Sequence, residues 1–198
     1  MARGTLIALV VIGILVVAVG GWAIGINNQL VRRDQDVSEK WAQVQNVYQR
    51  RADLIPNLVE TVRGFAAQER TVLEEVTKAR ASASSIQLTP EALNDPKALE
   101  RFQAAQQQLS GALSRLLVTV ERYPELKSNQ NFLALQSQLE GTENRIAVER
   151  RRFNESVREY NTRLRVFPAS LVANLVGFQP KAFFEATPDA ATPPKVKF

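Results

Sequence analysis

The chain has 198 residues, of which 45% are hydrophobic and 23% are charged, and its formal net charge is +5. This composition allows one packed domain with an appendage and differs from that of a disordered chain. The chain has neither histidine nor cysteine, which excludes disulfides, Cys/His zinc sites, and Ser-His-Asp or Cys-His nucleophiles. Only carboxylates, Lys, Tyr and Ser/Thr remain as candidate catalytic groups.

The first predicted element is a transmembrane helix. The sequence from Thr5 to Ile26 has no charged residue, and as a helix it would be about 33 Å long, enough to cross a bilayer core of ~30 Å. Trp22 near its end suits an aromatic belt. Residues 18–20 also fit a small-x-small cleavage pattern, but the apolar run continues past them, which favours a retained single-pass anchor over residues 1–28.

The side of the membrane on which the remaining chain lies is left open. Basic residues are more numerous after the apolar run than before it, which favours a cytoplasmic domain. A chain free of cysteine, however, also suits an oxidising compartment.

Residues 29–167 are predicted to form an all-α, up-and-down antiparallel bundle of long heptad-patterned helices. Apolar residues keep helical spacing from Val37 to Ile86, although Pro56 lies within this row. Unbroken spacing favours a helix that is kinked at the proline, which would give three helices. A turn near residues 53–56 would instead give pieces of matched length and a four-helix bundle. In either case, Asp53 and Asn57 are expected to satisfy the backbone groups that the proline frees.

Two further long helices follow. Residues 95–123 keep steps of three and four, with Asp95 as N-cap, Pro96 in the first helical position and Tyr123-Pro124 as the end. Residues 84–96 are predicted to be an exposed link, and residues 123–126 a tight connection. In the last helix, every seventh residue is large and apolar, in the order Phe132, Leu139, Ile146, Phe153, Tyr160 and Phe167.

Residues 168–186 are predicted to form a short apolar helix, closed by Gly177, and an apolar segment. Residues 187–198 are Pro- and Ala-rich and are predicted to be a disordered tail. The apolar residues of this region form a candidate interaction surface: Leu171, Val172, Leu175, Val176, Phe178, Phe183 and Phe184.

Polar residues interrupt the apolar rows, and they are the first candidate site. Arg51 with Glu69 or Glu149 could form an ion-binding or proton-handling cluster. The favoured interpretation is a polar layer, with Gln106 and Thr142, that fixes the helix register.

The charged residues of the last helix form a second candidate site. Pairs such as Glu155 with Arg158 and Glu159 with Arg163 have the spacing of a solvated face, which argues against an all-oxygen Ca²⁺ or Mg²⁺ site. The arginines at 150–152 favour a solvated face, anionic lipid headgroups or an acidic partner over nucleic acid.

Three long phrases resemble the LemA family of bacterial membrane proteins. They are RRADLIPNLVETVRGFAAQE, LLVTVERYPELKSNQNFLALQSQLEGTENRIAVERRRFNESVREYN and FPASLVANLVGFQPKAFFEA, within a resemblance that covers roughly Gln29 to Ala186. One departure is Phe153 before Asn154, where the family often has Tyr-Asn. The residues carried over from the family motifs are Arg50, Arg51, Asp53, Pro56, Asn57, Glu121, Tyr123, Pro124, Asn129, Asn131, Phe132, Glu143, Asn144, Arg145, Asn154, Tyr160, Asn161, Phe167, Pro168, Gly177 and Phe178.

The resemblance implies a membrane-anchored, mainly antiparallel helical bundle and no agreed enzymatic activity. We therefore expect a non-enzymatic scaffold in the cell membrane that self-assembles or binds other membrane proteins, with no cofactor, metal, nucleic acid or small-molecule substrate. The alternative is an adaptor or sensor of another membrane complex, in which a kink at Pro56 relays a change. A carboxylate-based hydrolase is a distant third.

Overall fold

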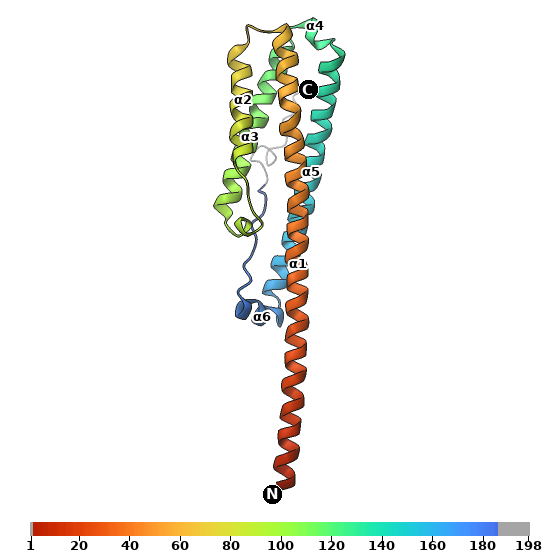
Figure 1. Cartoon of the computed structure of the whole chain (residues 1–198), viewed down its shortest axis with the longest axis vertical. Coiled ribbons are helices and arrows are strands. Elements are labelled where there is room, and N and C mark those ends of the chain that lie inside the picture. The colour runs from red at the N-terminus through yellow and green to blue at the C-terminus, as the bar shows by residue number, and fades with distance from the viewer. Residues whose placement is uncertain (1, 186–198) are drawn as a thin grey trace, which may run out of the picture.

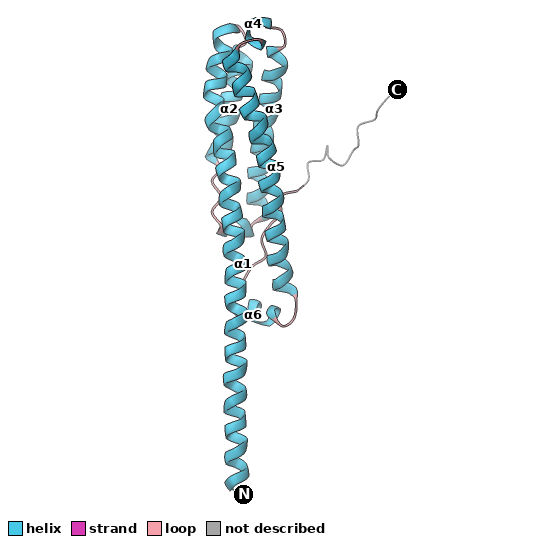
Figure 2. Cartoon of the chain, turned by 90° about the vertical axis from the view of Figure 1, so that its right-hand side faces the viewer, coloured by secondary structure: helices cyan, strands magenta, loops and turns pink. Residues whose placement is uncertain are grey.

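The computed structural model describes residues 2–185, and all the regular structure within them is helical (Figure 2). The predicted all-α fold with a long apolar N-terminal helix and an up-and-down bundle is confirmed. The elements in chain order are α1 (Ala2–Phe65), α2 (Arg70–Ser85), the 3₁₀ helix η1 (Glu91–Asn94), α3 (Pro96–Val120), α4 (Pro124–Lys127), α5 (Gln130–Arg165) and α6 (Ala169–Val176). Helices α1, α2, α3 and α5 form the bundle, and α6 lies at its lower end (Figure 1).

Helix α1 has 64 residues, a length of about 96 Å at 1.5 Å per residue. Its N-terminal part extends beyond the bundle, and the large apolar side chains between Leu6 and Ile24 are exposed (Figure 1). This part, which contains Thr5 and the exposed Trp22, is long and apolar enough to cross a membrane, a test that a signal sequence also passes. The expected end of the anchor, Ile26, is instead buried against α6, so the packed domain begins before residue 29.

The chain does not turn at Pro56. Helix α1 continues through the proline to Phe65, so the alternative of a turn at 53–56 is wrong. The expected continuity to residue 86 is also interrupted, because the chain reverses between α1 and α2. Glu69, a polar residue in the predicted apolar row, lies at this reversal. Its carboxylate accepts hydrogen bonds from the Tyr123 hydroxyl (2.7 Å) and from Arg122 (3.0 Å). The bundle therefore has four long helices, with the first turn later than expected.

The backbone carbonyl that Pro56 leaves without its helical donor is that of Ala52. It accepts a hydrogen bond of 2.7 Å from Nε of Arg80 on α2. Asp53 and Asn57, the expected partners of this region, do not bind the Ala52 carbonyl. Asp53 accepts a hydrogen bond from the Gln49 side chain, and Asn57 is exposed. A side chain of the neighbouring helix thus satisfies the group that the proline frees.

The predicted N-terminus of α3 is confirmed. Asp95 accepts a hydrogen bond from the backbone of Lys97 (3.0 Å), and Pro96 is the first helical residue. Helix α3 ends at Val120, three residues before Tyr123, and the expected tight connection contains the short helix α4. Asn129 then caps α5 by accepting from the backbone of Phe132 (3.1 Å), which gives this family-motif residue a structural role.

The heptad row of α5 is buried except at its end. Its first five members face the core, whereas Phe167 is 74% exposed because α5 ends at Arg165.

The expected exposed link at 84–96 also contributes to the core: Leu88 and Leu93 are buried, and Nε1 of Trp41 donates to the Leu88 carbonyl (3.0 Å).

An aromatic cluster fills the core of the lower half of the bundle. The Trp41 ring lies 5.4 Å from that of Phe102, 5.5 Å from that of Phe153 and 6.0 Å from that of Phe184. Aromatic pairs at such distances stabilise a core beyond the apolar area that they bury. Phe184 comes from the segment after α6, so this segment is part of the domain core.

Candidate functional site

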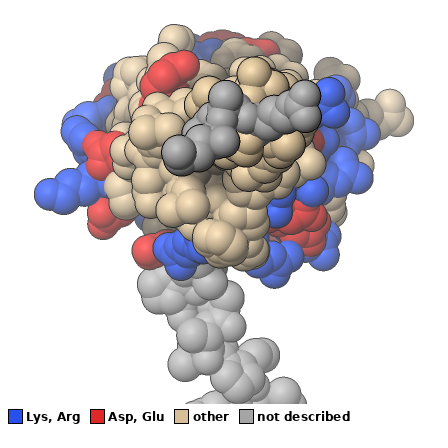
Figure 3. Space-filling model, turned by 90° about the horizontal axis from the view of Figure 1, so that it is seen from below, with Lys and Arg blue, Asp and Glu red and all other residues tan. Residues whose placement is uncertain are grey.

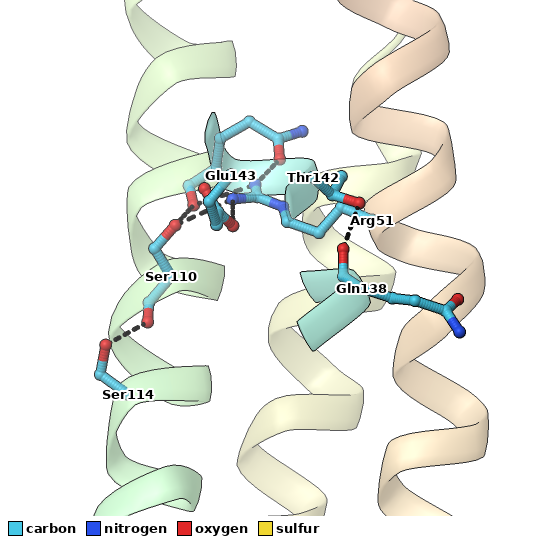
Figure 4. Close-up of polar contacts among 7 residues, drawn as sticks. Arg51, Ser110, Ser114, Gln138, Thr142 and Glu143 are labelled. Atoms are coloured by element: carbon cyan, nitrogen blue, oxygen red, sulfur yellow. Dashed lines mark hydrogen bonds and ion pairs between the residues drawn. The ribbon is translucent and has the colours of Figure 1, made fainter. Parts of the chain in front are cut away.

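Arg51 is the largest charged side chain in the core, and its own side chain is only 2% exposed. Helix α1 directs it across the bundle toward α3 and α5 (Figure 4). A buried charge requires partners, because transfer of an unpaired ion from water to a protein interior is strongly unfavourable. Its partners therefore define a site.

The guanidinium of Arg51 binds four groups. Nη1 donates to Oε1 of Glu143 (2.7 Å) and to Oγ of Ser110 (2.9 Å), as Figure 4 shows. Nη2 donates to the backbone carbonyl of Gln106 (3.4 Å) and to its side-chain oxygen. The guanidinium also lies 5.1 Å from the centre of the Tyr48 ring, and burial raises the pKa of that tyrosine. Among the described residues, Nε of Arg51 has no hydrogen-bond partner.

The predicted polar layer is therefore present, but two of the proposed partners of Arg51 are wrong. Glu69 binds Tyr123 at the upper end of the bundle, and Glu149 binds Arg152. Glu143, a family-motif residue, takes their place. Thr142 turns away and donates to the carbonyl of Gln138 (2.7 Å).

A groove begins at this polar layer and runs between α3 and α5. Its volume is about 510 Å³, and Leu58 of α1 lines it together with both flanking helices. The residues from α3 are Ser110, Leu113, Ser114 and Leu117, and those from α5 are Gln136, Leu139, Glu140, Glu143 and Asn144. Two carboxylates and no cationic side chain occur among these described lining residues, so the groove is apolar with an acidic edge.

A second group of polar side chains binds residues 178–185, here called the C-terminal strap, along α5. Asn161 makes two hydrogen bonds with the backbone of Lys181: Nδ2 donates to its carbonyl (2.8 Å), and Oδ1 accepts from its N–H (2.9 Å). Asn154 binds the backbone of Phe184 in the same way, with two bonds of 2.9 Å. Gln103 of α3 binds the backbone of Glu185. Amide side chains thus replace the backbone partners that an extended segment would have in a sheet.

Two further contacts hold the strap. The Tyr160 hydroxyl donates to the Gln179 carbonyl (3.1 Å), and burial with the nearby Asp34 carboxylate raises the pKa of Tyr160 to about 12. The buried Lys181 forms an ion pair with Asp34 (3.1 Å) and donates to the carbonyl of Pro90 (3.2 Å). Asn154, Tyr160 and Asn161 of the family motif thus all bind the strap.

The family model of the LemA family matches residues 40–198, which include the Arg51 layer, the groove and the strap. The chain belongs to the LemA family. No curated protein matches the chain. Membership of the LemA family indicates a membrane-associated protein and does not specify an activity.

The other LemA motif residues do not form one site. Gly177 ends α6 with a positive φ of 90°, a conformation that glycine adopts without strain. Pro168 comes directly before α6, Phe178 is half-buried beside it, Pro124 begins α4, and Glu121 pairs with Lys127. The remaining motif residues are exposed on the bundle surface: Arg50, Asp53, Pro56, Asn57, Asn131, Asn144, Arg145 and Phe167.

The candidate interaction surface at the C-terminus is smaller than expected. Val172 is buried against α1, and Phe184 lies in the aromatic cluster, so neither is free to bind a partner. The exposed members are Leu171, Leu175, Val176 and Phe183. The predicted tail at 187–198 lies outside the described residues.

The expected pairs on the last helix are also different. Glu159 pairs with Arg33 of α1, and Arg163 donates to Gln29 (2.8 Å). Among residues 2–185, no group of three or more His, Cys, Asp or Glu side chains is placed to hold a metal ion.

Sequence reasoning missed the strap partners Lys181, Asp34 and Gln103. One signal could have found the two asparagines: Asn154 and Asn161 each follow a large aromatic residue of the heptad row and are seven residues apart, so they lie on one edge of the helix.

Proposed function

We propose that this LemA family member is a single-pass membrane-anchored scaffold, without enzymatic activity, whose bundle binds an amphipathic helix of another membrane protein. The exposed apolar run of α1 supports the anchor, and family membership supports membrane association. The groove between α3 and α5 is the observation that carries the binding function.

The lining of the groove supports a helix as its occupant. Its floor is formed by the buried side chains of Leu58, Leu113 and Leu139 and by the half-buried Leu117, and apolar grooves of helical proteins take up one apolar helix face. Glu140 and the half-exposed Glu143 lie at its edge. The complementary occupant is a helix with an apolar stripe and flanking Lys or Arg residues.

The absence of cysteine from the sequence allows a direct test with single-cysteine variants. Ser114→Cys places a thiol in the groove, and Ser82→Cys places one on the exposed surface of α2 as a matched control. A photo-crosslinker is attached to each thiol in native membranes, and the products are identified by mass spectrometry. We expect an adduct with one other membrane protein from position 114 and not from position 82.

A charge reversal then tests the chemistry of the occupant. Glu140→Lys, introduced with Ser114→Cys, should reduce the adduct severalfold, because the acidic edge attracts the basic helix. An adduct of two copies of this chain would refute a foreign partner and establish self-assembly. Equal products from positions 114 and 82 would refute the groove as the binding site.

An adaptor or sensor of a membrane complex is the second candidate function. The observation that favours it is the continuity of α1 from the apolar run through Pro56 into the core, since one rigid helix can transmit a displacement of the anchor to the groove. If the chain is an adaptor or sensor, Pro56→Ala should change the yield of the Ser114→Cys adduct without loss of helicity. An unchanged yield would contradict it.

A further inference from the structure

A pocket lined by arginines lies between α1 and the C-terminal half of α5, close to the point where the apolar run of α1 ends. Its volume is about 780 Å³, and its charged lining consists of four arginines and one carboxylate, namely Arg32, Arg33, Arg158, Arg163 and Glu159. Glu159 pairs with Arg33, and Arg163 donates to the neutral Gln29 (2.8 Å). Among the described residues, neither Arg32 nor Arg158 has a carboxylate within ion-pair distance. The pocket thus keeps an excess of positive charge.

The position of this pocket along α1 corresponds to the headgroup layer of a membrane that α1 would cross. Arg32 and Arg33 follow Ile26 by six and seven residues, a rise of about 9–10 Å. The headgroup layer on each side of a bilayer is roughly 5–8 Å thick, and the long arginine side chain can extend toward it. The guanidinium groups can therefore reach lipid phosphates.

Helix α6 adds an exposed apolar surface at the same depth. Its inner face packs on Ile26 and Leu30 of α1, at the end of the apolar run. Its outer face exposes Leu171, Leu175 and Val176, with Leu175 exposed to 88%. Figure 3 views the molecule from this end, so that the N-terminal part of α1 comes toward the viewer; Lys and Arg side chains lie at the rim on both sides, together with Asp and Glu side chains. Apolar side chains surrounded by cations are typical of segments that lie in a membrane interface.

We propose that the arginine pocket binds the headgroup phosphate of an anionic phospholipid, and that α6 lies in the membrane interface with Leu171, Leu175 and Val176 among the acyl chains. The phosphate takes the place of the missing carboxylates around Arg32 and Arg158, and planar guanidinium groups bind phosphate oxygens in pairs. The bundle is then held upright on the bilayer at two points, α1 and α6. This inference rests on the membrane anchorage proposed above.

The first experiment measures lipid selectivity of the full chain. The protein is reconstituted in nanodiscs of equimolar phosphatidylcholine and phosphatidylglycerol, and native mass spectrometry counts the lipids that remain bound after release. We expect enrichment of phosphatidylglycerol. Replacement of Arg32, Arg158 and Arg163 by Gln keeps the Arg33–Glu159 pair and should reduce this enrichment at least about tenfold, since one cation near an anionic surface is worth roughly a fivefold gain in association.

A matched control changes the same charge at the other end of the bundle. Arg63, Arg70 and Lys78 line a separate surface pocket there, and their replacement by Gln should leave the enrichment unchanged. Equal losses in the two variants, or equal binding of the two lipids by the unmodified protein, would overturn the proposal. Displacement of phosphatidylglycerol by excess inorganic phosphate would assign the pocket to free phosphate and also overturn it.

The second experiment tests the position of α6 without disturbing the fold. Leu175→Cys carries an environment-sensitive fluorophore, and Val118→Cys, exposed to 71% near the end of α3, is the control. Brominated lipids should quench the probe at position 175 and not at position 118. Absence of quenching at 175 in nanodiscs would overturn the interfacial position of α6 alone. Failure of the protein to stay in alkali-washed membranes would overturn the anchor as well.

Discussion

Replacement of Glu143 by Gln should destabilise the bundle more than replacement of Arg51 by Met. Glu143 is the one carboxylate among the described residues within ion-pair distance of the buried guanidinium. Removal of one partner from a fully buried pair costs about 3–5 kcal/mol. The Glu143 side chain is 44% exposed, so water screens the pair and we expect a loss of about 1–2 kcal/mol.

The Arg51→Met variant removes the charge itself and keeps most of the side-chain volume. Ser110 already donates to the Gln106 carbonyl (3.2 Å), and Glu143 can turn to water. We therefore expect a change within about 1 kcal/mol in either direction, as for other buried ion pairs that are replaced by apolar groups. In the Arg51→Met background, Glu143→Gln should cause no further loss, because the charge that it leaves unpaired is absent.

Thermal unfolding of the full chain in detergent, followed by circular dichroism, measures these differences. In a chain of this size, 1 kcal/mol corresponds to about 2–4 °C in Tm, so Glu143→Gln should lower Tm by roughly 2–8 °C. Glu140→Gln is the matched control, since the Gln136 side chain is the one hydrogen-bond partner of Glu140 within residues 2–185, and its Tm should be unchanged. A larger loss in Arg51→Met than in Glu143→Gln, or an equal loss in Glu140→Gln, would show that Glu143 does not stabilise the buried guanidinium.

Three further outcomes are expected from the same unfolding assay or from proteolysis. Arg80→Ala should lower the free energy of unfolding by about 1–2 kcal/mol, because it leaves the Ala52 carbonyl unpaired. The loss should be smaller in a Pro56→Ala background, where residue 56 regains the N–H that can bind this carbonyl. Equal losses in both backgrounds would contradict this role of Arg80. Asn161→Ala frees both backbone groups of Lys181 and should speed tryptic cleavage after Lys181 at least severalfold, while Asn144→Ala, on the exposed face of α5, should leave the rate unchanged. Between pH 10 and about 12 the Tyr160 hydroxyl titrates in the unfolded chain but stays protonated in the folded one, so stability should fall as the pH rises through this window. Tyr160→Phe should flatten that part of the profile, and an unaltered slope would rule out Tyr160 as its source.

Structural features that depend on residues close together in the sequence were predictable. Asp95 and Pro96 begin α3, and Gly177 ends α6, because capping depends on groups within one turn of the helix end. The heptad row of α5 identified five of its core residues, because a seven-residue repeat places side chains on one face. The charge-free run before residue 27 identified the apolar part of α1 for the same local reason.

The sequence alone was thus sufficient to predict the helical class, the apolar N-terminal run, the start of α3, the end of α6 and the presence of a buried polar layer around Arg51. Tertiary structure alone decided which partners these residues take. Glu143 rather than Glu69 pairs with Arg51, Arg80 rather than Asn57 serves the Ala52 carbonyl, and the strap enters the core through Phe184. Each of these contacts joins residues that are far apart in the chain. Periodicity says which face of a helix is polar or apolar, whereas the choice of partner depends on how whole helices are placed against one another in space.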